Sequence, residues 1–239
     1  MRKNEHVQIL RESNALLFLI LLFCFDFAFI ILNLISSYTD FLSNPSFSLG
    51  TERGYSEVYQ YIKYFWIIIL LIFLSFKKSI NFFSWVIAFT YILIDDSLQF
   101  HERIGARIGA NLNFSPPFGL RLQDIGEVTV TLITGIFIFI LLVHSFKRGN
   151  LLFRKVTIDL ILLILIFMFF GVFVDMLHQT ITSVRELKYF FGIIEDGGEM
   201  LSVSFIFWYS ILICFKKEED NICFYKYVYN LISCKIKTV

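Results

Sequence analysis

Residues 124–148, DIGEVTVTLITGIFIFILLVHSFKR, decide the class of this fold. The central part of the stretch, 128–146, contains no Asp, Glu, Lys or Arg. As a helix it is long enough to cross a hydrocarbon core of about 30 Å. Two acidic residues precede this apolar run, and Lys147 and Arg148 end it. The stretch therefore predicts a transmembrane helix with an acidic start and a basic end.

Similar apolar stretches recur along the chain. Only 17% of the 239 residues are charged and 30 are Phe, which is too apolar for a soluble domain. The three prolines fall outside the apolar stretches, as expected because proline interrupts helix hydrogen bonding in lipid. We predict an all-α integral membrane protein, a single transmembrane domain over residues 1–239, with six transmembrane helices and a four-helix core made by the last four. The spans are about 16–35, 58–76, 81–100, 128–146, 156–177 and 198–215.

The basic residues predict the orientation of these spans. Most of the 21 Lys and Arg residues lie before the first span, between the second and third, between the fourth and fifth, or after the sixth. Basic residues concentrate on the cytoplasmic side of a membrane. We therefore expect a multi-pass protein of the plasma or inner membrane with both termini in the cytoplasm. Residues 218–239 mix apolar and basic residues at roughly helical spacing, which predicts a cytoplasmic amphipathic tail.

The second half of the chain contains a sequence similarity that indicates an internal repeat. Asp124-Ile-Gly-Glu127 and Asp196-Gly-Gly-Glu199 share the pattern D-x-G-E, and each precedes an apolar run that ends in two basic residues. The preceding spans match as Asp96-Ser-Leu-Gln99 and Asp175-Met-Leu-His178. This predicts two parallel-oriented helical hairpin repeats related by a pseudo-twofold axis. The alternative is chance resemblance between apolar hairpins.

The predicted topology brings nine of the 20 acidic residues to one level near the extracytoplasmic side. A charge at hydrocarbon depth costs at least about 2.5 kcal/mol, so these side chains should face one another rather than lipid. Carboxylates and imidazoles from facing helices form the metal sites of four-helix bundles, and these ligands suit Zn, Fe or Mn. We predict one or two divalent ions held within the set Asp96, His101, Glu102, Glu127, Asp175, His178, Glu195 and Glu199. Further polar intramembrane residues are Asp26, Asp95, Gln99, Asp124 and Asp196.

Simpler roles compete with metal binding for several of these residues. Asp124 and Asp196 could be helix N-terminal caps, because acids favour the positive end of a helix dipole. His178 could pair with Asp175 without a metal. Asp26 lies alone in the first span, so it must be protonated or have a partner. Arginines near the outer side could neutralise the acids or bind an anionic lipid headgroup; they are Arg103, Arg107, Arg121 and Arg185.

These observations favour a metal-dependent enzyme that acts on a membrane lipid or a lipid-linked substrate. Two other functions stay open: a proton or cation channel or transporter that uses paired intramembrane carboxylates, and a signalling or structural subunit of a membrane assembly. A protein partner or a second copy of the chain also stays open. Nucleic-acid binding is not expected, because the net charge is +1 and no basic patch carries interleaved aromatic residues.

Overall fold

The computed structural model describes residues 2–39, 42, 44–114, 116, 120–180 and 185–215. In this part of the chain the secondary structure is helical and no strand is present, which confirms the all-α class. The long helices are α1 (Arg2–Tyr38), α2 (Tyr55–Lys77), α3 (Phe83–Leu98), α4 (Phe100–Gly109), α5 (Leu122–Arg148), α6 (Leu151–Met168) and α8 (Arg185–Phe215). Shorter elements are η2 (Pro45–Phe47), η3 (Ile80–Phe82), the π-helical η5 (Phe169–Val174) and α7 (Asp175–Thr180). The predicted tail at 218–239 lies outside the described residues.

Five helical segments of the described chain are long and apolar enough to cross a membrane, so the chain has the character of a multi-pass membrane protein. They are Asn14–Tyr38, Tyr55–Lys77, Leu122–Arg148, Leu151–Thr180 and Glu186–Phe215. Their outward faces carry large exposed apolar side chains, such as Ile133 and Ile136, which suits contact with lipid. The orientation of the termini stays a prediction.

The expected third span, 81–100, is divided in the structure. Helix α3 ends after 16 residues, and Gln99 adopts a left-handed conformation with φ 53° before α4 begins in a new direction. Sixteen residues of α-helix are about 24 Å long, less than a full hydrocarbon core. Six crossings are therefore not confirmed.

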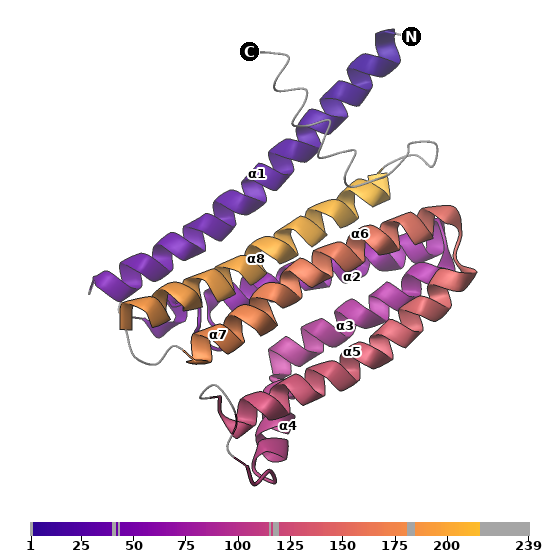
Figure 1. The fold of residues 1–239 in the computed structure, drawn as a ribbon. Coiled ribbons are helices and arrows are strands. Elements are labelled where there is room, and N and C mark those ends of the chain that lie inside the picture. The colour runs from indigo at the N-terminus through magenta and orange to yellow at the C-terminus, as the bar shows by residue number, and fades with distance from the viewer. Residues whose placement is uncertain are drawn as a thin grey trace.

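Helix α8 lies at the centre of the bundle, in contact with α1, α2 and α6 (Figure 1). Apolar side chains from α2, α3, α6 and α8 form a common core that includes the buried Tyr64, Trp85 and Trp208. The paired helices α3 and α5 lie on the far side of α6 and α8 from α1 (Figure 1).

Close packing of glycines holds α4 against the start of α5. Gly105 and Gly109 are spaced as in the small-xxx-small pattern that lets helix backbones approach closely. A Cβ atom added to Gly126 of α5 would collide with the carbonyl oxygen of Gly105. Since neither position has room for a side chain, α4 is fixed across the first turns of α5. His101 and Glu102, at the start of α4, are thereby placed near the polar end of α5.

The predicted repeat is not supported by the positions of its two D-x-G-E quartets. Asp124 lies in the first turn of α5, whereas Asp196 lies well inside α8, which begins at Arg185. Helix α8 begins well before the predicted span at 198. Its first part, residues 185–197, is a helix of mixed polarity. Apolar length alone could not indicate that start.

Candidate functional site

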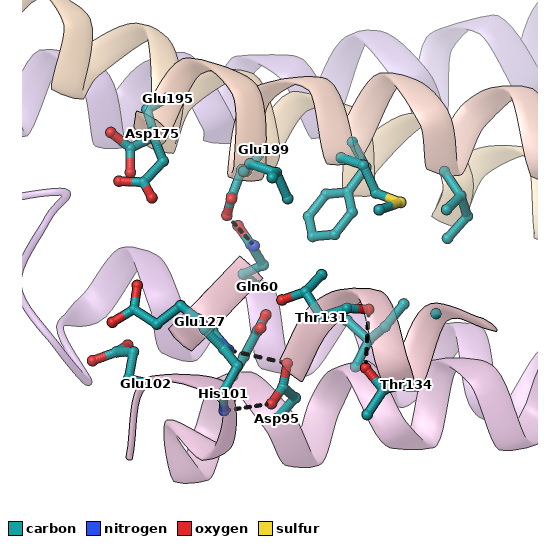
Figure 2. Close-up of a pocket in the computed structure, with 18 of the residues that line it drawn as sticks. Gln60, Asp95, His101, Glu102, Glu127, Thr131, Thr134, Asp175, Glu195 and Glu199 are labelled. Carbon is teal, nitrogen blue, oxygen red and sulfur yellow. Dashed lines mark hydrogen bonds and ion pairs between the residues drawn. The ribbon is translucent and has the colours of Figure 1, made fainter. Parts of the chain in front are cut away.

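A cavity of about 680 Å³ lies between α3 and α5 on one side and α6, α7 and α8 on the other (Figure 2). The described residues that line it include two histidines, one arginine and ten carboxylates. The carboxylates are Glu52, Glu57, Asp95, Asp96, Glu102, Glu127, Asp175, Glu195, Asp196 and Glu199. All eight predicted metal-site residues line this one cavity. Glu52 and Glu57 come from the chain before and at the start of α2, outside the predicted span at 58–76.

Three of these side chains are close enough to share one ion. One ligand atom from each of Asp175, His178 and Glu195 lies within 4.8 Å of the other two. Nδ1 of His178 is 2.6 Å from Oε2 of Glu195, so these two groups already form a hydrogen-bonded pair. Asp175 and His178 are one turn apart on α7, and Glu195 faces them from α8.

The π-helical segment η5, immediately before α7, packs against α8 beside this trio. A Cβ atom at Gly171 would collide with the carboxylate of Glu199, so glycine makes room for that side chain. Oε2 of Glu199 also accepts a hydrogen bond of 3.4 Å from Gln60 of α2. Single-turn π segments are frequent at functional sites, and here the segment joins α6 to the residues of the trio.

On the opposite wall, Asp95 and His101 form a pair across the break between α3 and α4. Asp95 accepts hydrogen bonds from the backbone amide of His101 at 2.9 Å and lies 3.0 Å from its Nδ1. Burial lowers the pKa of His101, but the hydrogen bond and charge of Asp95 outweigh it and raise that pKa to about 9. Burial also raises the pKa of the neighbouring Glu102, and the nearby Glu52 adds to this effect.

Several other carboxylates are bound by neutral or local partners. Gln123 donates a hydrogen bond of 2.7 Å to Glu127. Asp124 accepts bonds from the backbone and the guanidinium of Arg121, at 2.7 and 2.9 Å. The N-cap is therefore Arg121, and Asp124 is the third helical residue of a capping box rather than the cap itself. Asp196 is not a cap, since it lies inside α8.

The remaining predicted residues lie apart from the trio. Arg103 and Arg107 are exposed and do not line the cavity, and the side chain of Arg185 lies outside the described part. Arg121 lines the cavity but binds Asp124. Gln99 occupies the turn between α3 and α4 and does not line the cavity.

Asp26 has a partner that hydropathy alone does not reveal. Its Oδ1 lies 3.1 Å from Nζ of Lys63, and both side chains are buried. Lys63 also donates hydrogen bonds to the carbonyl of Met200 at 2.8 Å and to Ser204 at 3.0 Å. A lone lysine inside the apolar stretch 58–76 is the signal of such a buried acidic partner.

Comparison with known proteins places the chain in a family. The model of the family described as a domain of unknown function (DUF8692) matches residues 14–215, so the chain belongs to this family. No curated protein and no solved structure matches it.

Proposed function

We propose that this member of the DUF8692 family is a metal-dependent enzyme of the membrane that acts on a lipid or lipid-linked substrate. Asp175, His178 and Glu195 would hold a divalent Zn, Fe or Mn ion. The observation that carries the proposal is their convergence within 4.8 Å on the wall of a large cavity among apolar helices.

The donor set fits a transition metal. One imidazole nitrogen and two carboxylate oxygens match the ligands that these ions take in proteins, and three protein ligands leave a coordination position for water. Ligand atoms around a tetrahedral ion with bonds of about 2.0–2.1 Å lie about 3.3 Å apart. The trio lies within 4.8 Å, and Nδ1 of His178 is only 2.6 Å from Glu195, so an ion would replace this hydrogen bond and the ligand atoms would have to adjust to an even spacing. Side-chain rotation at Asp175 and Glu195 can supply this movement.

The neighbouring residues can support hydrolysis. A bound ion of this kind lowers the pKa of its coordinated water to about 7 and so supplies a hydroxide nucleophile at neutral pH. Glu199 and Glu127 face the same space from opposite walls (Figure 2) and can accept a proton. Gln60 and Gln123 fix the directions of these two carboxylates through hydrogen bonds.

Elemental analysis of the detergent-purified full chain, loaded with each metal and dialysed, tests the proposal. We expect about one ion per chain for the unaltered protein and loss of that ion in Asp175→Asn and Glu195→Gln. Glu102→Gln is the matched control, because Glu102 lines the cavity outside the trio. A protein that retains no metal, or that retains it equally in all variants, would contradict the assignment.

Cation transport is the second candidate function. The observation in its favour is the excess of ten carboxylates over one arginine among the described lining residues. Against it, the cavity lining beyond Thr134 continues with apolar residues such as Ile138 and Leu142, and Asp26 is already paired with Lys63. Proton or divalent-cation flux in proteoliposomes that Glu199→Gln abolishes would favour transport over catalysis.

A further inference from the structure

The same cavity has an apolar half. Beyond Thr131 and Thr134 (Figure 2), it is lined by Ile138 and Leu142 of α5 together with side chains of α3 and α6. The hydroxyl of Thr134 donates to the carbonyl of Val130 in its own helix, so it offers no free donor to a ligand. A space with carboxylates at one end and apolar walls at the other has the polarity of an amphiphile.

This apolar half is open toward the side of the bundle. Gly135 and Phe139 of α5 and Leu165 and Met168 of α6 line the cavity and are also exposed. Nothing lies within 4 Å of a Cβ atom added at Gly135. The two helices therefore leave a lateral opening at the level of the apolar spans, where a bilayer would surround the protein.

The depth of the cavity matches a long hydrocarbon chain. From Glu127 to Leu142, two residues that line it on one helix, the helical rise is about 22 Å, of which the apolar half beyond Thr134 takes about 12 Å. Half of a hydrocarbon core is about 15 Å thick. The apolar half can therefore accept most of the tail of a bilayer lipid while its head reaches the carboxylates.

The polar half selects the head. Ionised carboxylates only accept hydrogen bonds, and carboxyl groups far outnumber arginine among the described lining residues. The guanidinium of Arg121, the one arginine among the described lining residues, is hydrogen-bonded to Asp124. His101, the charged histidine of the lining, is likewise held by Asp95. In the metal-free cavity an amine or hydroxyl head would donate to the carboxylates, whereas a phosphate head would meet more acceptors than donors.

We infer that the substrate is a long-chain amphiphile with a hydrogen-bond-donating head, which enters between α5 and α6 and lays its chain along the apolar half. This deepens the proposed function and rests on it for the chemistry at the head, but chain binding is measurable without any metal.

Photo-crosslinking in phosphatidylcholine nanodiscs tests the inference. The probe is hexadecylamine with a diazirine at the end of its chain. We expect label on Ile138 and Leu142 of the full chain, and about tenfold less label in Gly135→Phe, whose ring would fill the opening. Ile136→Phe is the matched control, because the neighbouring Ile136 is exposed and does not line the cavity. Unlabelled hexadecylamine or hexadecanol should compete, and hexadecyl phosphate should not.

Label spread evenly over the outward faces of α5 and α6 would overturn the inference, and this mapping is decisive even if Gly135→Phe does not fold. Equal competition by hexadecyl phosphate would overturn the choice of head. Asp175→Asn separates the two proposals: retained labelling with no metal in any sample rejects the metal site alone. Metal binding without site-specific label rejects the amphiphile alone.

Discussion

Charged residues are buried in two ways in this molecule. Between α1, α2 and α8, Asp26 faces Lys63. The ammonium of Lys63 also donates hydrogen bonds to two acceptors on α8. In the cavity, carboxylates outnumber basic side chains and are held largely by amides or by histidine. A packed interface excludes water, so each charge needs a fixed partner, whereas a cavity can admit water and cations. The first arrangement pairs each charge within the packed bundle, and the second leaves carboxyl groups in excess of basic side chains along the described cavity wall.

Breaking the buried pair should have the largest effect. Lys63→Met leaves Asp26 unpaired in a packed interface, and we expect a loss of about 3–5 kcal/mol in the free energy of unfolding. Denaturant unfolding in detergent, followed by circular dichroism, measures it. The double variant Asp26→Leu with Lys63→Met removes both charges and should recover most of the loss. Equal instability of the single and double variants would show that the charge imbalance is not the cause.

In the cavity, by contrast, the measurable effect should be a gain in stability when a metal ion binds. A metal ion at one hundred times its Kd should stabilise the unaltered protein by about 2.7 kcal/mol, because only the folded chain assembles the trio. Glu195→Gln should lose this stabilisation, and Glu102→Gln should keep it. Thermal unfolding with and without the metal measures both. A metal-dependent gain that survives in Glu195→Gln would place the ion elsewhere.

The helical class and most spans could be predicted because apolar length is a direct requirement of the bilayer. The break at Gln99 could not, since a left-handed glutamine is uncommon and the sequence around it has no glycine or proline. The start of α8 was equally hidden, because exposed polar residues such as Glu186 and Lys188 look like a loop when only hydropathy is considered. The buried partner of Asp26, Lys63, was hidden for a similar reason, because the stretch around it is apolar enough to be taken as a simple span.

The cost of burying charge was enough to predict that Asp96, Glu127 and the other predicted site residues face one space. It could not indicate which of them come within reach of one ion. That depends on how the π-helical η5, which immediately precedes Asp175, packs against α8. This packing is tertiary, and Gly171, which makes room for Glu199, is its mark in the sequence.

Alanine substitutions at two glycines of α5 should change the free energy of unfolding in opposite directions, because one glycine packs against backbone and the other faces open space. Gly126→Ala places a methyl group against the carbonyl of Gly105, and we expect a loss of about 2 kcal/mol through overpacking of α4. Gly135→Ala meets open space and should stabilise the helix by about 0.5–1 kcal/mol. Unfolding of both variants measures the contrast. Effects of the same sign would contradict the close approach of α4 and α5.

A similarly small effect, but one that depends on pH, should come from His101, the charged histidine that lines the cavity. Burial opposes that charge, but Asp95, with smaller contributions from Glu102 and Asp96, raises the pKa of His101 to about 9. The ordinary value is 6.5, so the charged pair contributes fully below about pH 6.5, and its contribution disappears as the pH rises through about 9. Because His101 is partly exposed, we expect about 1 kcal/mol. The difference in unfolding free energy between the unaltered protein and His101→Gln should therefore shrink across this range. A difference that is constant with pH would mean that His101 acts through packing, and that the cavity has no built-in counter-charge at this wall.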